Sequence, residues 1–368
     1  MGLKTTRGTQ IPGDAGGGVK GRGAPSNLEG RYEAWAREVV HDGWAHEQDD
    51  APPPLKTVVT LEPAKSIIAR NDSPDLGFDQ SINPYRGCEH GCVYCYARPS
   101  HAYLGLSPGL DFETRIFAKT NAAELLRKEL AAPRYRCSPI AIGVNTDAYQ
   151  PAERELRITR SVVEVLTECE HPFTLITKNA LIERDIDLIA PAAAKRLTGA
   201  AVSITNLDPE LARKLEPRAA APYRRLETVR RLADAGIPVT VMVAPVIPFI
   251  TDRHIEEILE RAKEAGARGA WYVLLRLPHE VAPLFKEWLA THYPLKAEHV
   301  MSLVHQMREG KDYDSTFGVR QRGTGSFADL IEKRFELACE RLGLNGEREP
   351  LDTTRFRPPR VGPQMDLF

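Results

Sequence analysis

The chain of 368 residues lacks several features that define common protein classes. It has no run close to the roughly 18 uninterrupted apolar residues that a membrane span needs. Its basic N-terminus is not followed by the apolar stretch of a secretory signal. The formal net charge is −1, so the chain carries no overall basic excess for neutralising nucleic-acid phosphates, although a local basic patch is compatible with this balance. We therefore expect a cytoplasmic protein with no membrane partner.

Cysteine is scarce, and its distribution is informative. Three of the six cysteines are clustered as Cys88, Cys92 and Cys95, with the spacing Cys-x3-Cys-x2-Cys and no fourth cysteine nearby. A disulfide framework needs an oxidising compartment, and nothing in the chain indicates one. We expect ordinary buried thiols at the other three positions, Cys137, Cys169 and Cys339.

The spacing of the three clustered cysteines favours an iron–sulfur cluster. A structural zinc site takes four ligands in a closed tetrahedron. His90 is separated from Cys88 and from Cys92 by one residue each, and this stretch of chain is too short for all three side chains to bind one zinc ion easily. A ferredoxin-type cluster uses four cysteines. Three thiolates suit a cubane iron–sulfur cluster but leave one iron without a protein ligand, where a small molecule can coordinate. Zinc and ordinary buried thiols remain as the alternatives.

Composition divides the chain into four parts. Residues 1–55 contain glycine, proline and basic runs and predict a flexible tail, in which residues 31–40 have the pattern of a short amphipathic helix. Residues 56–77 form a lead-in segment, and residues 78–312 have the composition of a folded core. Residues 313–368 predict a helical extension that ends in a loose tail rich in proline and arginine.

Short apolar runs alternate with helical patterns in the core. Strands are predicted near residues 81–85, 140–144, 173–177, 197–205, 239–243 and 270–275. Helices are predicted at residues 153–168, 182–193, 209–215, 222–235 and 252–265, the last with Asp252 as N-cap, and then at 281–291, 297–308 and 327–342. This alternation implies parallel βαβ units with right-handed crossovers, and we expect an α/β fold with six βα units. An open doubly wound sheet and a barrel-like sheet both fit the pattern.

The cysteine loop resembles the signature of the radical S-adenosylmethionine (SAM) superfamily, Cys-x3-Cys-x-aromatic-Cys, with Tyr94 at the aromatic position. The resemblance implies a [4Fe-4S] cluster on the three cysteines, with SAM chelating the fourth iron. It also implies reductive cleavage of SAM to a 5′-deoxyadenosyl radical, with electrons from a flavodoxin- or ferredoxin-type reductant. The implied fold is a partial (β/α)6 TIM-like barrel over about residues 78–312. Sites in such folds lie at the carboxyl ends of the strands.

Within this superfamily the chain looks most like the branch of spore photoproduct lyase and of uncharacterised proteins labelled DNA-repair-photolyase-like. The shared features are Tyr94-Cys95-Tyr96 and the strand-end pairs Thr146-Asp147 and Thr177-Lys178, together with residues 202–205. By this resemblance, Thr146, Lys178 and Ser203 would contact the amino-acid end of SAM, and Asp147 its ribose. Tyr94 would place its backbone beside the cluster. The alternative is that the hydroxyl groups of Thr146 and Ser203 do no more than cap the helices that follow these strands, and that Lys178 is a solvated surface residue.

One departure from this branch concerns the hydrogen donor. Spore photoproduct lyase returns a hydrogen atom from a cysteine just ahead of the position of Thr146, where this chain has Val144 and Asn145. Cys137 should lie at the opposite end of that strand. Repair of a thymine dimer by that route is therefore not expected, and Tyr96 is the remaining candidate for a radical relay. Residues 98–113 are expected either to contact substrate or to pack around the cluster.

Two functions follow from these patterns. The first is a radical SAM enzyme that abstracts hydrogen from an unidentified substrate, with DNA, RNA and peptides all open. The second is a non-catalytic iron–sulfur protein that senses redox state or binds nucleic acid.

Overall fold

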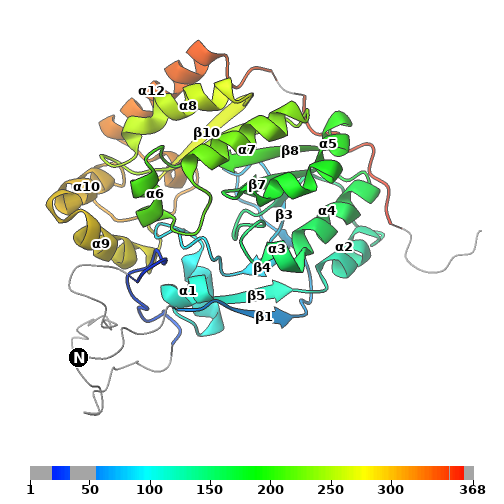
Figure 1. Cartoon of the computed structure of the whole chain (residues 1–368), viewed down its shortest axis with the longest axis horizontal. Helices are drawn as coiled ribbons and strands as arrows, with labels where there is room; N and C mark the ends of the chain where they lie inside the picture. The colour runs from blue at the N-terminus through cyan, green and yellow to red at the C-terminus, as the bar shows by residue number, and fades with distance from the viewer. Residues whose placement is uncertain (1–18, 34–54, 348, 360–368) are drawn as a thin grey trace, which may run out of the picture.

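A seven-stranded sheet forms the centre of the molecule in the computed structural model, which describes residues 19–33, 55–347 and 349–359 (Figure 1). Its strand order is β10-β9-β8-β7-β6-β3-β2. The bounds are β2 Ile68–Arg70, β3 Gln80–Ile82, β6 Ile140–Ile142, β7 Phe173–Thr177, β8 Thr198–Ser203, β9 Val239–Val246 and β10 Gly269–Leu274. All neighbours pair in parallel except β2 and β3, which are antiparallel.

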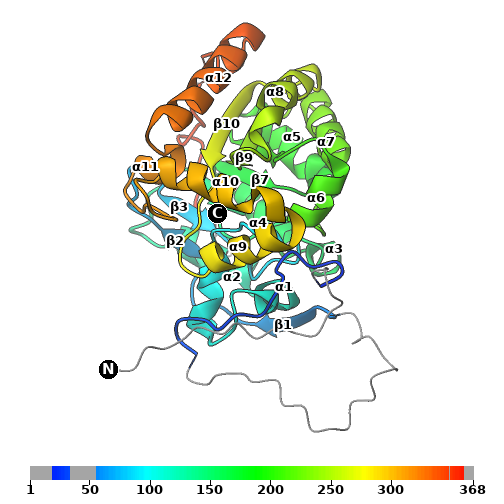
Figure 2. The same ribbon diagram turned by 90° about the vertical axis from the view of Figure 1, so that its left-hand side faces the viewer.

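Helices follow the parallel strands and cover the outer side of the sheet (Figures 1 and 2). They are α3 (Glu153–Leu156) and α4 (Ile158–Glu168), η2 (Ala180–Asp185) and α5 (Ile186–Ala194), α6 (Pro209–Leu215) and α7 (Pro222–Asp234), η3 (Asp252–His254) and α8 (Ile255–Glu264). After β10 come α9 (Val281–His292), α10 (Pro294–Gln306), α11 (Val319–Arg322) and α12 (Ser326–Leu342). Six consecutive parallel strands with these crossovers confirm the predicted partial (β/α)6 barrel and the C-terminal helices.

Two local predictions are wrong in detail. The helix predicted at residues 153–168 is broken at Arg157, whose φ of 52° is left-handed, so α3 ends there and α4 begins after it. Asp252 does not cap a helix, because it is the first residue of η3, and the side chain of Thr251 at the N-cap makes no capping hydrogen bond. In both places the helical pattern of the sequence continues across a backbone change that only tertiary packing imposes.

A small second sheet, absent from the sequence prediction, lies beside the barrel. It has the order β1-β5-β4, with β1 Val58–Glu62, β5 Arg115–Lys119 and β4 Tyr85–Arg86. The helices η1 (Arg98–Leu104), α1 (Leu110–Thr114) and α2 (Ala122–Leu130) flank it in the chain. Four of the five residues of β1 are exposed, so this strand lacks the alternation of buried and exposed positions that marks a strand in sequence.

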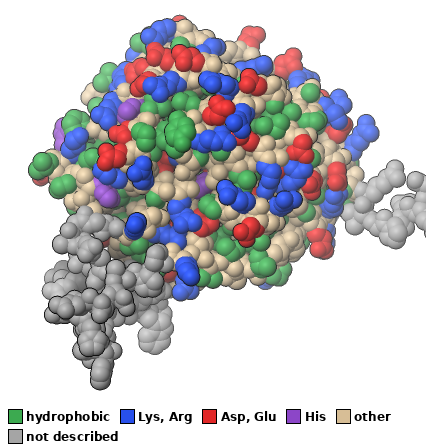
Figure 3. Space-filling model, viewed as in Figure 1, with side chains coloured by type: hydrophobic (Ala, Val, Ile, Leu, Met, Phe, Trp, Pro, Cys, Tyr) green, Lys and Arg blue, Asp and Glu red, His purple; other side chains and the backbone are tan. Residues whose placement is uncertain are grey.

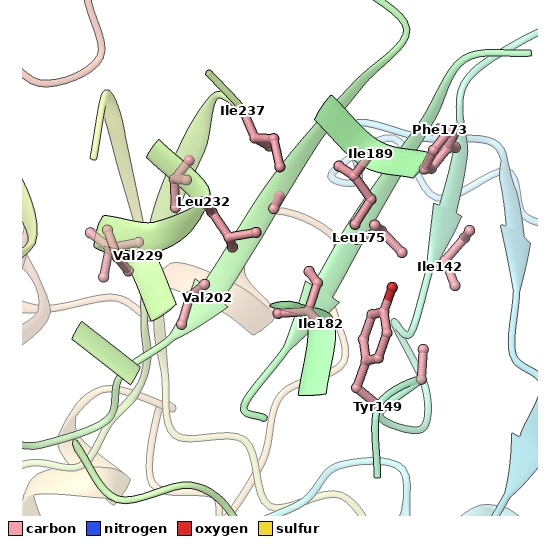
Figure 4. Packing of buried hydrophobic residues seen from close by; sticks show 14 of the residues in the cluster. Ile142, Tyr149, Phe173, Leu175, Ile182, Ile189, Val202, Val229, Leu232 and Ile237 are labelled. Atoms are coloured by element: carbon pink, nitrogen blue, oxygen red, sulfur yellow. The ribbon is translucent and has the colours of Figure 1, made fainter. Parts of the chain in front are cut away.

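Branched aliphatic side chains between the sheet and its helices make the main core. Ile142, Leu175 and Val202 extend from three neighbouring strands toward Ile182 and Val229 on the helices that follow them (Figure 4). All five are essentially inaccessible to solvent. Fully burying a side chain of this kind contributes about 1.5–3 kcal/mol, so this layer keeps the strand ends in fixed positions.

Part of the predicted N-terminal tail is packed. Residues 19–33 lie against α1 and α9, and Ala24 is fully buried there. Of the helix predicted at residues 31–40, the structure describes only residues 31–33, which are not helical. The rest of the predicted tail, apart from residue 55, lies outside the described residues.

The C-terminal tail is also packed over its described part. The ring of Phe356 lies 5.0 Å from His171 and 5.6 Å from Tyr135, between ring centroids. The backbone N–H of Arg357 donates to the carbonyl of Cys169 at 2.9 Å. The prediction of a loose tail therefore does not hold for residues 349–359.

Charged side chains of both signs are interspersed on the face shown in Figure 3. This agrees with the formal net charge of −1. Among the described helices, none combines the length and the apolar character needed to cross a bilayer.

We predict that His171 makes the stability of the protein depend on pH. Burial lowers its pKa to about 4, while an unfolded histidine titrates near 6.5. The unfolded state therefore binds more protons between these values, and stability that is present above pH 6.5 is lost as the pH falls toward 4. Each unit of difference in pKa is worth about 1.4 kcal/mol. Urea unfolding of His171→Gln should show a flatter pH dependence than wild type.

The matched control for this prediction is His279→Gln, because His279 is exposed. This variant should keep the wild-type slope between pH 6.5 and 4. Equal slopes for wild type and His171→Gln would contradict the prediction.

Candidate functional site

The three cysteines lie in one loop that begins after β4, beside the ends of the barrel strands. The N–H of Cys88 donates to the carbonyl of Phe112 at 2.9 Å, and the N–H of Cys95 donates to the carbonyl of Cys92 at 3.2 Å. Gly87 precedes Cys88 with a φ of +76°, and a Cβ there would lie 2.9 Å from the Phe112 carbonyl oxygen. A side chain at position 87 would thus be both strained and crowded, which explains the glycine at the start of the loop.

The chemistry of this donor set fits an iron–sulfur cluster. Cys88 and Cys92 are 7% exposed, and all three thiols are free. Burial raises the pKa of each thiol, and the neighbouring carboxylate of Asp147 raises that of Cys88 further. Thiolates in such surroundings need a bound cation, and metal ligation deprotonates them. Cys88, Cys92 and Cys95 are thus the residues that would hold the cluster.

The ring of His90, which lies between Cys88 and Cys92 in the sequence, is bonded to residues outside the cysteine loop. His90 is not available as a further ligand. Its Nε2 lies 3.1 Å from Asn179 Nδ2, which donates to it, and its Nδ1 lies 3.3 Å from Asp147 Oδ2. Both ring nitrogens of His90 are therefore used in holding the loop to strand ends.

Asp147 joins the loop to the ends of two strands. Its Oδ1 accepts from Thr177 Oγ1 at 2.7 Å and from the Tyr149 N–H at 2.9 Å. Its Oδ2 accepts from the Lys178 N–H at 2.7 Å and faces His90. Burial works to raise its pKa, but His90 and these donors lower it below its ordinary value. Because a carboxylate offers about four acceptor positions, a ribose contact would have to displace one of these bonds.

Lys178 follows β7 and reaches across the site. Its Nζ lies 3.3 Å from the Ala244 carbonyl oxygen and 3.7 Å from Glu216 Oε1, and 5.8 Å from the centroid of the Tyr94 ring. The side chain is 16% exposed, so Lys178 is not a solvated surface residue. Burial lowers the pKa of its ammonium group. An ammonium group has three N–H donors, and those that these contacts leave free can bind an anionic ligand beside the cysteine loop.

Glu216 is the buried centre of this network, and the sequence analysis missed it. Its carboxylate accepts from the Tyr94 hydroxyl and from Thr205 Oγ1, the latter at 2.7 Å. It also forms a buried ion pair with Arg225, whose Nη1 donates to the Ser203 carbonyl at 3.0 Å. The pair therefore connects Tyr94 in the cysteine loop with the end of β8. Glu216 stands in a loop far from every short motif, so local sequence offers no signal for it.

Thr146 and Ser203 also lie at strand ends beside the loop, as predicted. Thr146 Oγ1 donates to the Tyr85 carbonyl at 2.9 Å, which leaves its lone pairs to accept. Ser203 is 6% exposed at the last position of β8. The structure thus places Thr146, Asp147, Lys178, Ser203 and Tyr94 around one end of the barrel, but their contacts with SAM stay predictions.

Tyr96 lies on the exposed side of the loop, with 43% of its surface accessible. Its hydroxyl donates to the Val144 carbonyl, and the guanidinium of Arg276 lies 4.7 Å from its ring centroid. Arg276 lies two residues after the end of β10 and was not identified from the sequence. Cys137 precedes β6, so it lies toward the opposite end of that strand from Val144, as expected.

The comparisons with known proteins agree with this geometry. Residues 82–262 match the model of the Radical SAM superfamily. An uncharacterized protein of Mycobacterium tuberculosis (strain ATCC 25618 / H37Rv) is 36% identical over 337 residues, which are 86% of this chain and 94% of that protein. The chain belongs to the radical SAM superfamily. An uncharacterized protein of Methanocaldococcus jannaschii is 25% identical over 237 residues, covering 64% of this chain and 84% of the relative.

The fold resembles that of spore photoproduct lyase. A variant of that enzyme aligns with a TM-score of 0.56 and 17% sequence identity, over 84% of this chain and 88% of the other. A complex of the enzyme with a dinucleoside spore photoproduct aligns with a TM-score of 0.55 at 17% identity, over 78% and 80% of the two chains. At this identity the likeness establishes the shared radical SAM fold. The superfamily implies SAM and a [4Fe-4S] cluster as cofactors.

We predict that Glu216→Gln destabilises the protein strongly. The change leaves the buried Arg225 guanidinium without its counter-charge, and breaking a buried pair in this way costs about 3–5 kcal/mol. Urea unfolding should show this loss. The matched control is Glu227→Gln on the outside of α7, where the pairs with Arg230 and Arg231 are largely solvated, and little change is expected. A Glu216→Gln variant as stable as the control would refute the prediction.

Proposed function

We propose that the protein is a radical SAM enzyme whose [4Fe-4S] cluster is held by Cys88, Cys92 and Cys95. When bound and reduced, the cluster supplies the electron that cleaves SAM to methionine and a 5′-deoxyadenosyl radical, which abstracts hydrogen from the substrate. One observation carries the proposal most directly. Two buried thiols and one half-buried thiol occupy one loop at the strand ends, and His90 is already bonded through both ring nitrogens.

The chain's own residues bind and orient SAM in this proposal. Lys178 Nζ offers a positive charge to the carboxylate of the methionine end, and Thr146 and Ser203 offer hydroxyls beside it. Glu216 and the Ala244 carbonyl hold the Lys178 ammonium from the protein side. The Asp147 carboxylate orients His90 and the Lys178 backbone, and it accepts from a ribose hydroxyl in place of one of its present donors. A one-electron donor of flavodoxin or ferredoxin type would reduce the cluster in the cell.

We predict that anaerobically reconstituted protein, reduced with dithionite, converts SAM to 5′-deoxyadenosine and methionine, which chromatography would quantify. Cys92→Ala should lose both the cluster absorbance and the cleavage, since each thiolate is needed for three-point ligation. Cys137→Ala is the matched control and should keep both, because Cys137 lies before β6, toward the far end of that strand. A fully loaded cluster that cleaves no SAM would favour the non-catalytic iron–sulfur function instead.

The substrate proposed for this site is a nucleic acid, and the support comes from the surroundings of Tyr96. The Arg276 guanidinium lies 4.7 Å and 5.9 Å from the ring centroids of Tyr96 and Tyr313. Its Nη2 donates to the Tyr313 hydroxyl at 3.2 Å, while its buried Nε has no partner. Among the described residues no carboxylate pairs with Arg276. Aromatic faces beside a cation without a carboxylate partner suit stacked bases and a phosphate, and a dinucleoside occupies the similar fold of spore photoproduct lyase.

We predict that Arg276→Gln weakens binding of a fluorescein-labelled single-stranded oligonucleotide about 10- to 100-fold, because a hydrogen bond to a charged group is worth about 1.5–3 kcal/mol. Fluorescence anisotropy at fixed salt would measure the change. The control is Arg261→Gln, an exposed arginine on α8 that pairs with Glu257 on its own helix. Equal losses in both variants, or no binding by wild type, would rule out a nucleic-acid site at Arg276.

A further inference from the structure

The N-terminal segment 21–31 crosses directly over the cysteine loop. Gly23 approaches Gly91, which lies between Cys88 and Cys92, so closely that a Cβ on Gly23 would be 1.6 Å from the Gly91 carbonyl oxygen. The backbone N–H groups of Gly23 and Ala24 both donate to the carboxylate of Glu113, at 3.0 and 2.8 Å. Segment and loop are thus in backbone contact.

Glu113 connects the segment to the cysteine loop through Arg98. The two side chains form an ion pair at 2.5 Å and are both fully buried. Arg98 Nε donates to the Cys92 carbonyl at 2.9 Å, and its Nη1 donates to the carbonyls of Pro108 and Gly109. The Glu113 carboxylate therefore receives Arg98 on one side and two backbone N–H groups of the segment on the other. Removal of the segment would leave buried acceptor positions on this carboxylate unfilled.

The other side of the segment is anchored on α9. Ser26 Oγ donates to Glu287 Oε2 at 2.7 Å, and Arg31 Nε pairs with Glu280 Oε1 at 2.8 Å. Just before the first anchor, Ala24 packs in a small apolar cluster with Leu110 and Leu284. The segment consequently joins α1 to α9, beside which it runs in both ribbon views (Figures 1 and 2).

We propose that residues 21–31 are a positioning element of the cluster site. Docked on Glu113, they fix the turn between Cys88 and Cys92 and keep solvent from the thiols. Gly23, Glu113 and Arg98 act through the backbone of this turn and touch no substrate. The inference rests on the proposed function for the identity of the bound group, but the contact between segment and loop is independent of it.

The test is Gly23→Ala, whose methyl group would collide with the Gly91 carbonyl. Gly77→Ala is the matched control, since a Cβ at Gly77 would meet nothing within 4 Å. After anaerobic reconstitution, Gly23→Ala should lose its cluster absorbance in air about tenfold faster than wild type or more. Losses of this size are typical when residues behind metal ligands are changed. The electron paramagnetic resonance spectrum of the reduced cluster should also change, while Gly77→Ala matches wild type in both measurements.

A second readout needs no cluster. In cluster-free protein, the rate at which iodoacetamide alkylates Cys88 and Cys92 should rise about tenfold or more in Gly23→Ala, because displacing the turn exposes thiols that are buried in wild type. Glu113→Gln, which replaces one accepting oxygen by a donor, should act in the same direction. The circular dichroism spectrum of Gly23→Ala should stay close to that of wild type. Unchanged alkylation rates in both variants would overturn the inference. Failure of wild type to bind a cluster would instead count against the proposed function, and alkylation would still decide this inference.

Discussion

The buried ion pair between Glu216 and Arg225 holds the candidate site together. Arg225 donates to the Ser203 carbonyl at the end of β8, and Glu216 accepts from Tyr94 in the cysteine loop and from Thr205. Two charges buried in this way are costly unless each finds several partners, and here they do. The pair therefore fixes the cysteine loop relative to the barrel strands. It also holds Lys178, whose Nζ lies 3.7 Å from Glu216 Oε1.

A second buried pair, Arg98 with Glu113, performs the corresponding task on the other side of the loop. The cysteine loop thus lies between two ion pairs, and the arginine of each pair donates to backbone carbonyls. This arrangement suits a site whose ligands come from a single loop, because thiols on a mobile loop would not stay in register with strand ends.

Sequence patterns predicted those barrel elements well whose ends and buried positions are marked by a few consecutive residues. Strand β7 and helix α6 have the predicted bounds, since β7 alternates buried and half-buried residues and Asp208-Pro209 marks the start of α6. The exposed strand β1 and the break at Arg157 carry no such signal. The cysteines were identified by spacing alone. Glu216 was not, because it lies 122 residues from its partner Tyr94, and such contacts form only in the folded chain.

The contacts of the N-terminal segment have a consequence for the order in which the molecule is assembled. Ser26 and Arg31 bind α9 over sequence separations of 261 and 249 residues, so the ribosome makes the segment first and its anchor much later. Contacts of such long range form late in folding. The partner of the segment on the other side, Glu113, lies only 90 residues from Gly23 in the chain. The two sides of the segment therefore gain their partners at different stages of synthesis, the Glu113 side well before the α9 side.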